Sequence, residues 1–323
     1  MEPILVTGVA GFIGARTAEL LLNNGQSVIG IDNMNDYYDT RLKSHRLERL
    51  RTMKDFVFMP MDIEDFQRLK ALFSDFPISA VINLAARAGV RYSIENPHVY
   101  MTTNAIGTLN LLECMKIYGV NKLVLASTSS LYAGHPLPFT EDRAVNQPIS
   151  PYAASKKSAE VMAYTYHYLY GIDVTVFRYF TVYGPAGRPD MSPFRFIKWI
   201  SEDTPVTVFG DGTQSRDFTF IDDIAMGTIL GLKRIGFEII NLGGGVTPCS
   251  INSLIQRIEK LLGKKATVRY LQSNKADMSE TMADISKAKE LLNWSPVIDL
   301  DEGLEKTVKW HIENSRLVRE IVP

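Results

Sequence analysis

The sequence has little of the residues that mark disulfide-rich, metal-binding and repetitive proteins. Cysteine occurs only twice in 323 residues, at Cys114 and Cys249, and each lies in its own apolar stretch. This usage predicts buried free thiols and a reducing compartment rather than a disulfide framework. The five histidines are scattered without a Cys/His ligand spacing, so we expect no metal site. Tandem repeats and low-complexity tracts are also missing, which argues against a solenoid.

Long apolar runs and a strong net charge are missing as well. No window approaches the roughly 20 apolar residues of a membrane span, and the start of the chain lacks the features of a signal peptide. A net charge of −1, without a basic stripe, argues against binding to nucleic acid or to an anionic membrane. With 46% hydrophobic residues, the chain suits one or two globular domains. We therefore expect a soluble, cytoplasmic enzyme with no membrane or nucleic-acid partner.

The first half alternates short apolar runs with amphipathic stretches. The expected strands are Ile4–Val6, Val28–Ile31, Phe56–Met59, Ala80–Leu84 and Lys122–Ala126, and the expected helices include Phe12–Asn24, Asp65–Phe73 and Asn104–Tyr118. Because the strand runs are continuously apolar rather than alternating, they predict parallel strands that are covered on both faces. The pattern predicts an α/β fold with a Rossmann-type doubly wound parallel sheet.

The pattern changes after about residue 180, where prolines and glycines become frequent. Helices are expected at Ile251–Leu262 and Ser286–Leu292, and a segment near 217–242 is expected to return to the main sheet. The change predicts a smaller, mixed α/β lobe that binds the substrate. The predicted domains are residues 1–180 with about 217–242, which form the sheet domain, and residues 181–216 with 243–323, which form the lobe.

A glycine-rich loop joins the first expected strand to the first expected helix. Gly8, Gly11 and Gly14 allow a tight turn, so that backbone N–H groups at the positive end of the helix can approach a pyrophosphate. Phe12 and Ile13 begin this helix and are expected beside the same phosphates. A glycine loop alone also suits an ordinary turn, so its context decides the interpretation.

That context is a set of residues at the ends of the following strands. Asp32 ends the second expected strand, near the distance of about 20 residues at which a carboxylate binds a ribose diol, and Asn33 follows it. Since a carboxylate repels a 2′-phosphate, NAD is favoured over NADP. Asp62, followed by Ile63, is expected either at the adenine edge or as the N-cap of the next helix. The fourth expected strand ends in residues over which a flat cofactor can pass, although they also suit simple packing: Leu84, Ala85 and Ala86.

Tyr152 and Lys156 are the most informative pair. Their four-residue separation puts both side chains on one helix face, about one turn apart. A phenol normally ionises near pH 10, but a nearby ammonium and the positive nicotinamide of bound NAD both favour the phenolate. Tyr152 is then a candidate general base toward a substrate hydroxyl. The spacing alone is common on protein surfaces, and the upstream glycine loop is what favours catalysis.

Hydroxyl residues close the fifth expected strand, at the carboxyl edge where α/β proteins bind ligands. We expect Thr128 to be the catalytic hydroxyl, with Ser127 and Ser129 as alternatives, and Ser130 continues the run. All four are candidates for binding a sugar hydroxyl. Hydroxyls after a strand also make ordinary caps.

Together these segments resemble the NAD-dependent epimerase/dehydratase family, a group of extended short-chain dehydrogenases/reductases, over essentially the whole chain. The family-like stretches are Gly8–Gly14, Asp32–Asn33, Asn104–Thr108, Ser127–Ser130, Tyr152–Lys156, Arg178–Pro185 and Ser215–Asp223. The resemblance implies bound NAD, with Asn104 near it, and a nucleotide-sugar substrate. It also implies that Arg216 contacts the substrate pyrophosphate, with an ion pair to Asp217 or Asp222 as the alternative. Asp277 stands where relatives bind the uridine ribose, but Asn274–Asp277 departs from the family's Arg-Pro-Gly-Asp pattern.

The reaction within the family is indicated by Ser129 and Ser130. Dehydratases carry an Asp-Glu pair at these positions, and without it the elimination of water lacks its proton carriers. This difference indicates a 4-epimerase, in which Tyr152 takes the 4-hydroxyl proton and the 4-keto sugar turns over before hydride and proton return. The stretches Asp32–Asp39, Ala88–Ser93 and Gly187–Met191 resemble those of UDP-glucuronate 4-epimerases.

A uronic acid substrate also requires groups that hold its carboxylate and prevent decarboxylation. Candidates are Ser129, Ser130, Thr181 and Arg188, although Arg188 equally suits a solvent-facing loop. Alternative activities are a UDP-glucose or UDP-N-acetylhexosamine 4-epimerase and a UDP-glucuronate decarboxylase. A non-catalytic NAD-binding regulatory protein is a further alternative, which the presence of both Tyr152 and Lys156 argues against. Surplus apolar residues on Asn104–Tyr118 and Tyr152–Tyr170, helices that relatives pair into a four-helix interface, predict a homodimer.

Overall fold

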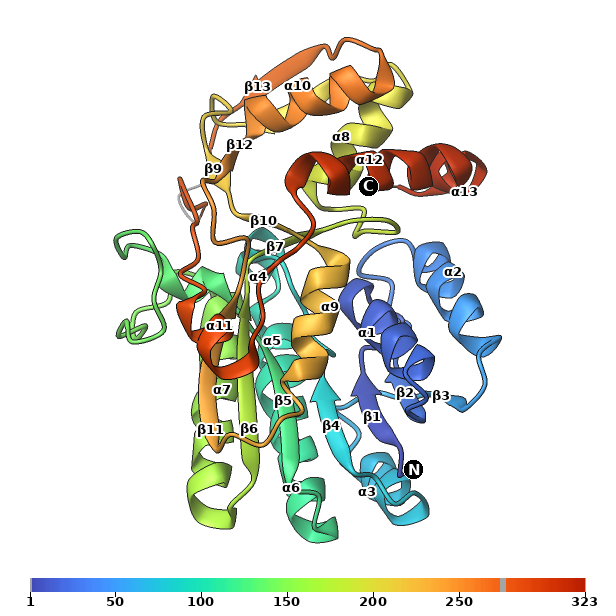
Figure 1. The fold of residues 1–323 in the computed structure, drawn as a ribbon, viewed down its shortest axis with the longest axis vertical. Helices are drawn as coiled ribbons and strands as arrows, with labels where there is room; N and C mark the ends of the chain where they lie inside the picture. Colours follow the sequence, from blue (N-terminus) through green and yellow to red (C-terminus); the bar gives the residue numbers. More distant parts are fainter. Residues whose placement is uncertain (1, 274–276, 323) are drawn as a thin grey trace.

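A seven-stranded parallel sheet forms the centre of the protein. The computed structural model describes residues 2–273 and 277–322, and the strand order is β11-β6-β5-β4-β1-β2-β3 (Figure 1). The strands are β1 (Ile4–Thr7), β2 (Val28–Asp32), β3 (Phe56–Pro60), β4 (Ala80–Asn83), β5 (Lys122–Thr128), β6 (Asp173–Tyr179) and β11 (Phe237–Leu242). The chain order reverses between β1 and β4, which opens a crevice at the carboxyl ends of the strands. The predicted Rossmann-type doubly wound sheet is confirmed.

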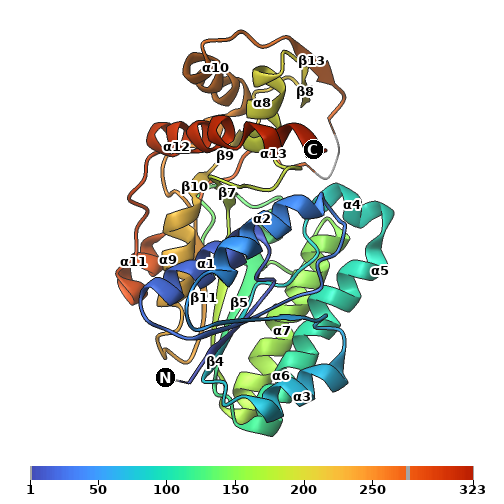
Figure 2. The ribbon, with the colours of Figure 1, turned by 90° about the vertical axis from the view of Figure 1, so that its right-hand side faces the viewer.

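Each strand divides its side chains between two apolar cores, which explains why the strand runs are continuously apolar. In β1, Ile4 and Val6 belong to one core and Leu5 to the other. Three helices cover each face, on opposite sides of the sheet (Figure 2). On one side lie α1 (Phe12–Asn23), α9 (Ile221–Leu230) and α11 (Ser286–Leu292), and on the other α3 (Phe66–Asp75), α6 (Gly107–Tyr118) and α7 (Pro151–Tyr170). α2 (Thr40–Arg51) connects β2 to β3 and packs beside α1.

The ends of α7 follow from local sequence. Pro151 occupies its first turn, and the Ser150 side chain accepts a hydrogen bond from the backbone N–H of Ala153. Gly171 ends the helix in the left-handed conformation, with φ 69°. The helix expected at Asn104–Tyr118 begins with a π-helical turn, Met101–Ile106, and α6 proper starts at Gly107.

The lobe lies beyond the carboxyl edge of the sheet (Figure 1). Its elements include α8 (Ser192–Ser201), β8 (Val206–Phe209), α10 (Ile251–Leu262), β13 (Val268–Leu271), α12 (Leu300–Glu313) and α13 (Ser315–Glu320). Two short strand pairs connect the lobe to the sheet domain: β7 (Thr181–Tyr183) with β10 (Phe218–Phe220), and β9 (Ser215–Arg216) with β12 (Cys249–Ser250). A third core, in which Leu254, Ile258 and Leu304 are buried, holds the lobe helices together.

Part of the segment expected in the lobe packs elsewhere. β11 returns to the sheet as predicted, but it is an edge strand whose outer face needs a cover. That cover is α11, and Ala283, Ala288 and Trp294 join the sheet core instead of the lobe core. The Trp294 side chain also donates a hydrogen bond to the carbonyl of Asp223 in α9, at 2.9 Å. The predicted lobe range of 243–323 therefore contains an excursion back to the sheet domain.

The helices and the potential metal ligands of the described residues bear on two other protein classes. None of the helices in residues 2–273 and 277–322 combines the length and the apolar character needed to cross a membrane. The same residues contain no group of three His, Cys, Asp or Glu side chains suited to a metal ion. Cys114 is buried and Cys249 partly buried, and both are free thiols.

Candidate active site

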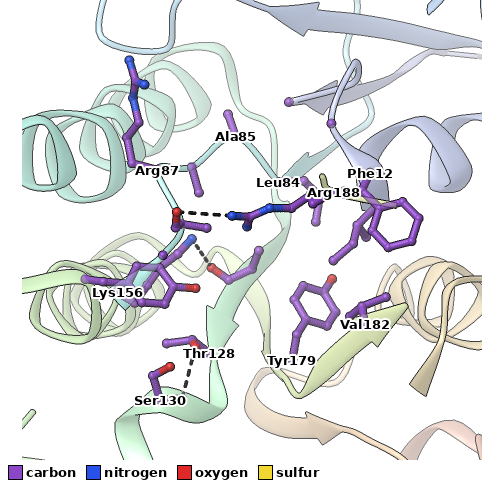
Figure 3. Close-up of a pocket in the computed structure, with 18 of the residues that line it drawn as sticks. Phe12, Leu84, Ala85, Arg87, Thr128, Ser130, Lys156, Tyr179, Val182 and Arg188 are labelled. Carbon is purple, nitrogen blue, oxygen red and sulfur yellow. Dashed lines mark hydrogen bonds between the residues drawn. The ribbon is translucent and has the colours of Figure 1, made fainter. Parts of the chain in front are cut away.

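A cavity of about 420 Å³ lies at the carboxyl edge of the sheet, where the lobe faces it (Figure 3). The predicted site residues that line it from the sheet domain are Gly8, Gly11, Phe12, Ile13, Gly14, Asp32, Asn33, Asp62, Ile63, Leu84, Ala85, Ala86, Ser127, Thr128, Ser129, Ser130, Tyr152 and Lys156. Those from the segments after β6 are Thr181, Arg188, Arg216 and Asp277. This volume is within the range of about 300–1,000 Å³ that is typical of small-molecule sites.

The glycine loop has the geometry of a phosphate cradle. Gly8 has φ +66°, and a Cβ on it would lie 2.7 Å from the backbone nitrogen of Ala85. A Cβ on Gly14 would lie 2.1 Å from the Gly8 carbonyl oxygen, so the turn closes only with glycine. The N-cap of α1 is Gly11, which offers no side-chain cap to the first N–H groups of the helix. These exposed donors suit the pyrophosphate of a dinucleotide.

Asp32 ends β2 beside this loop, buried at 7% exposure. One carboxylate oxygen accepts a hydrogen bond from the Ala10 backbone at 3.1 Å, and the other accepts one from the Met34 backbone at 2.8 Å. The Lys43 ammonium lies 3.7 Å from the second oxygen. Asp32 thus ties the glycine loop to the end of β2 and carries negative charge at the place predicted for a ribose diol.

Lys43 is a further residue of the site, which the sequence does not indicate. It projects from α2 into the cavity wall, where burial lowers the pKa of its ammonium and Asp32 acts in the opposite direction. The available signal was its place as the one lysine of α2, the helix that follows the acidic end of β2, and a single basic residue on a helix does not by itself indicate a ligand site. Only the packing of α2 beside α1 brings Lys43 to Asp32.

The two interpretations of Asp62 are separated by its hydrogen bonds. Asp62 accepts hydrogen bonds from the Glu64 backbone at 2.9 Å and from the Asn33 side chain at 2.6 Å. The N-cap of α3 is Asp65, whose side chain accepts from the Arg68 backbone. The N-cap alternative for Asp62 is therefore wrong, because the helix begins at Phe66 and Asp65 is its cap.

Asn104 is the one predicted cofactor residue that does not line the cavity. Its side chain accepts a hydrogen bond from the Arg87 backbone N–H and donates one to the Arg87 carbonyl, both at 2.9 Å, and it donates another to the Ser155 hydroxyl. Because these partners use its amide group, Asn104 fixes the loop after β4 against α7 rather than facing a ligand. Arg87 itself reaches the cavity and donates to Asn35 at 3.3 Å.

Both residues of the predicted catalytic pair line the cavity from α7, and Figure 3 shows the position of Lys156. The Thr128 hydroxyl at the end of β5 hydrogen-bonds to Tyr152, and the Lys156 ammonium donates to the Ala126 carbonyl at 2.9 Å. Burial raises the pKa of Tyr152, while the hydrogen bond from Thr128 and the charge of Arg188 act to lower it. Burial lowers the pKa of Lys156 to about 8, against the opposing charge of Glu160.

The direction of the pKa shift of Tyr152 corrects one expectation. We expected the Lys156 ammonium to depress the pKa of the phenol, but in this structure burial dominates and the pKa is raised. The physical reason is that desolvation disfavours the charged phenolate in an apolar wall. The groups that oppose the rise are Thr128 and Arg188.

The hydroxyl residues Ser127–Ser130 have two different roles in the structure. Ser127 is 4% exposed and donates its hydroxyl hydrogen to Glu160 at 2.6 Å, so it is occupied by the protein although it borders the cavity. Thr128 also accepts a hydrogen bond from the Ser130 backbone at 3.1 Å, which caps the short helical turn that follows β5. This cap turns Ser129 and Ser130 toward the cavity wall. Thr181, at the start of β7, lines the same cavity.

Arg188 lies inside the site rather than in solvent. It forms an ion pair with Asp190, with a distance of 3.0 Å from Nε to the carboxylate, and its guanidinium lies 5.8 Å from the ring centre of Tyr37. It also donates to the Ala88 carbonyl at 3.4 Å (Figure 3). The solvent-facing alternative is wrong, because Asp190, Tyr37 and the loop after β4 surround the side chain, which is 21% exposed.

Arg216 does not form either of the ion pairs named as alternatives. Its guanidinium donates to the Ser215 carbonyl at 2.7 Å and borders the cavity. Asp217 instead accepts hydrogen bonds from backbone N–H groups, including that of Ala283 at 2.8 Å, and Asp222 pairs with Arg16 at 2.8 Å. Burial lowers the pKa of the Arg216 guanidinium, with Asp277 acting in the opposite direction.

Asp277 pairs with Arg91 from α4 (Val90–Glu95), a residue that was not predicted to have a role. The Arg91 guanidinium lies 3.8 Å from the ring centre of Phe209. Residues 274–276, which belong to the stretch that departs from the family pattern, lie outside the described residues.

Comparisons with known proteins agree with this geometry. Residues 5–307 match the family model described as GDP-mannose 4,6 dehydratase. A UDP-glucuronate 4-epimerase of Thermodesulfobacterium geofontis is 62% identical over 317 residues, which cover 98% of each chain. The UDP-glucuronic acid 4-epimerase of Bacillus cereus, solved with UDP-glucuronic acid and NAD, has 41% identity and a TM-score of 0.91 over 96% of this chain and 99% of that one. A Thermotoga maritima UDP-glucose 4-epimerase, solved with UDP-glucose, has 32% identity and a TM-score of 0.89, and the match covers 97% of this chain and 99% of that one.

Proposed function

Because the chain belongs to the family of GDP-mannose 4,6-dehydratases and NAD-dependent epimerases, we propose that it is an NAD-dependent UDP-glucuronate 4-epimerase. The observation that carries the proposal is the joint lining of one cavity by Tyr152, Lys156 and Thr128 on one side and by Ser129, Ser130 and Thr181 on another. The first group suits proton transfer, and the second offers neutral hydroxyls where a dehydratase needs an acid/base pair. The 62% identity to a UDP-glucuronate 4-epimerase supports the same substrate.

Bound NAD accepts a hydride from C4 of the sugar and returns it. The proposed cradle for its phosphates is the Gly8–Gly14 loop with the first turn of α1, and Asp32 receives the adenosine ribose. The hydrophobic walls beside it are Phe12, Ile13 and Ile63, with Leu84, Ala85 and Ala86 on the other side. Asp32 already holds Lys43 at 3.7 Å, so the site combines a carboxylate for the diol with a nearby cation.

Tyr152 takes the proton from the sugar 4-hydroxyl as the C4 hydride leaves, and later returns it. Thr128 steadies the phenolic oxygen by its hydrogen bond. In the proposed mechanism the charge of the Lys156 ammonium, one helical turn away, also favours the phenolate. The 4-keto sugar must then present its other face, which the tether through its diphosphate permits. Arg216 borders the cavity on the lobe side and is the proposed contact of that diphosphate, with Asp277 beside it for the nucleoside ribose.

A 4-keto uronate is a β-keto acid and loses carbon dioxide when its carboxylate aligns with the carbonyl π system. We propose that the hydroxyls of Ser129, Ser130 and Thr181 hold the carboxylate out of that alignment. Arg188 is already paired with Asp190, so its contribution to the substrate requires that this pair opens or shares the guanidinium. Neutral hydroxyl donors suit this task because they bind a carboxylate without supplying a proton carrier for elimination.

The proposed domain roles follow from these contacts: residues 1–180 with about 217–242 hold NAD, and the lobe holds the nucleotide sugar. We also propose a homodimer formed through α6 and α7. The π-helical turn before α6 exposes Ile106, α6 exposes Ile117, and α7 exposes Val161, Tyr164 and Tyr168, the last at 77%. Exposed apolar residues on two adjacent helices mark a contact surface. The cytoplasmic location stays a prediction from the sequence.

The experiment that tests the proposed function is incubation of the purified protein with UDP-glucuronate, followed by NMR of the products. UDP-galacturonate is the expected product. A UDP-pentose would identify a decarboxylase and overturn the carboxylate clamp. Turnover of UDP-glucose or a UDP-N-acetylhexosamine in place of UDP-glucuronate would reassign the substrate, and NAD binding without any turnover would favour a regulatory protein.

A further inference from the structure

The catalytic face of α7 extends one turn beyond the predicted pair. Tyr152, Lys156 and Glu160 follow one another at four-residue spacing, which stacks them on one side of the helix. All three bind the last residues of β5. Their respective partners are the Thr128 hydroxyl, the Ala126 carbonyl at 2.9 Å and the Ser127 hydroxyl at 2.6 Å.

Glu160 is in turn held by an arginine from the next strand. Arg178 on β6 donates to both carboxylate oxygens, with Nε at 3.0 Å and Nη2 at 2.9 Å. Glu160 is 2% exposed and Arg178 is 1% exposed, so water screens this pair little. Arg178 also donates to the Tyr132 hydroxyl at 2.9 Å. The pair therefore clamps α7 to β5 and β6 at the level of the reacting groups.

A purely structural need does not explain this arrangement, since apolar residues of similar volume often stabilise a core as well as a buried ion pair does. The pair is also placed where its charge matters, one helical turn from Lys156. Glu160 acts to keep the buried Lys156 ammonium protonated. Arg178 limits that effect, because it neutralises most of the same carboxylate.

We propose that Glu160 and Arg178 are positioning residues for the epimerisation: together they set the register of α7 on β5, and their balanced charges set the protonation of Lys156 and Tyr152. The inference rests on the proposed function for its kinetic readout. In this proposal, Glu160 contacts neither the substrate nor the cofactor. Ser127 serves as the link that transmits the position of Glu160 to the strand end that carries Thr128.

Besides Glu160, several charged or titratable groups lie around the same site. They are Arg178 from β6, Tyr132 from the turn after β5, Tyr100 from α5 (Pro97–Tyr100) and Arg188 from the loop after β7. Lys157 on α7 itself lies 3.6 Å from Glu160. Neither Glu160 nor Arg178 lines the cavity, so both can be exchanged for neutral residues without altering its walls.

The test is the pH dependence of kcat in Glu160→Gln and Arg178→Met. Loss of the carboxylate leaves a positive charge near Tyr152 and Lys156, so both pKa values fall and the pH profile moves to lower pH. Loss of the guanidinium leaves a negative charge, so the profile moves to higher pH. We expect a displacement of about one pH unit in each direction. A structural role alone gives no reason for opposite displacements.

Matched variants separate position from charge. Arg178→Lys keeps the charge and should return the profile toward that of the wild type. The double variant Glu160→Gln/Arg178→Met removes both charges, so its profile should stay in place while kcat falls about ten-fold or more at unchanged KM, because the helix is no longer clamped. Asp173→Asn breaks the buried Lys122–Asp173 pair at the far end of the same strands, about 20 Å away. It should lower the thermal unfolding midpoint without moving the profile.

A second readout does not depend on turnover. The ¹³Cε signal of Lys156, identified by its loss in Lys156→Met, should titrate at lower pH in Glu160→Gln and at higher pH in Arg178→Met. The inference is overturned if the Lys156 titration moves in the same direction in folded Glu160→Gln and Arg178→Met, or does not move in either. A folded double variant with wild-type kcat overturns it as well. Absence of epimerase activity in the wild type would overturn the proposed function instead, and the Lys156 titration would still decide this inference.

Discussion

Arg91 and Asp277 form an ion pair that joins α4 of the sheet domain to the lobe, although 186 residues separate them in sequence. The guanidinium of Arg91 also lies 3.8 Å from the ring centre of Phe209 in β8. Arg216 borders the same region, and the charge of Arg91 acts to lower its pKa. Two arginines and one carboxylate therefore meet where the nucleotide is proposed to bind.

Asp277→Ala should raise KM for UDP-glucuronate about ten-fold with little change in kcat, since the proposed contact is far from C4 and serves ground and transition states alike. Steady-state kinetics measure both constants. Arg257→Ala is the matched control, because it breaks the exposed Arg257–Asp301 pair in the lobe and should leave KM unchanged. A fall in kcat at constant KM in Asp277→Ala would contradict the assignment.

Tyr152→Phe should reduce kcat by a factor of about 10²–10⁴, because the general base is lost while the ring stays in place. NAD should still copurify, as measured after denaturation of the protein, since the phosphate cradle and Asp32 are untouched. Tyr166→Phe, on the same helix but on the side of Glu113, serves as a control for loss of a hydroxyl. Comparable activity in Tyr152→Phe would remove Tyr152 from the mechanism.

Activity should fall as the pH rises through about 8. A lysine carries its charge below its pKa, and burial lowers the pKa of Lys156 to about 8, so the ammonium that favours the Tyr152 phenolate is lost above that pH. The measurement is kcat against pH from 6 to 10. Lys156→Met should be slower and should lack this decline, whereas a wild-type profile that stays flat to pH 10 would show that Lys156 does not titrate in this range.

Asp32→Ser should weaken the preference for NAD over NADP. The carboxylate that repels a 2′-phosphate is then absent, and Lys43, which lies 3.7 Å from it, becomes available to an anion. Dissociation constants for both cofactors give the ratio, which we expect to shift by about ten-fold or more. Asp65→Ser, which replaces the cap of α3, is the matched control for loss of a nearby carboxylate. An unchanged ratio in Asp32→Ser would separate Asp32 from cofactor selection.

Charges on the outward face of α7 should dissociate the proposed dimer. Val161→Arg and Tyr168→Lys place unpaired cations in the proposed contact, where they must be desolvated. Sedimentation velocity of the wild type should give a dimer and that of the double variant a monomer. Val297→Lys alters a side chain that is 79% exposed in another part of the molecule and should keep the dimer. A monomeric wild type would refute the proposal directly.

Local sequence was enough for the features that depend on neighbours in the chain. The glycines at Gly8 and Gly14 are demanded by the turn itself, and the spacing of Tyr152 and Lys156 places both on one helix face. Continuous apolar runs predicted the parallel sheet, because two cores share each strand. The family motifs then indicated the cofactor and the reaction, which the comparisons support.

Tertiary structure alone decided which polar groups meet. Nothing in the local sequence distinguishes Lys43 from the arginines around it in α2, or Arg91 from other surface arginines, until folding brings Asp32 and Asp277 to them. Ser127 and Thr128 are neighbours with similar side chains, yet one faces Glu160 and the other Tyr152, because successive residues of a strand point in opposite directions. Asn104, a predicted ligand of the cofactor, is used by the loop after β4 instead. Short-range pattern specifies elements, whereas the partners of a buried charge depend on how distant elements pack.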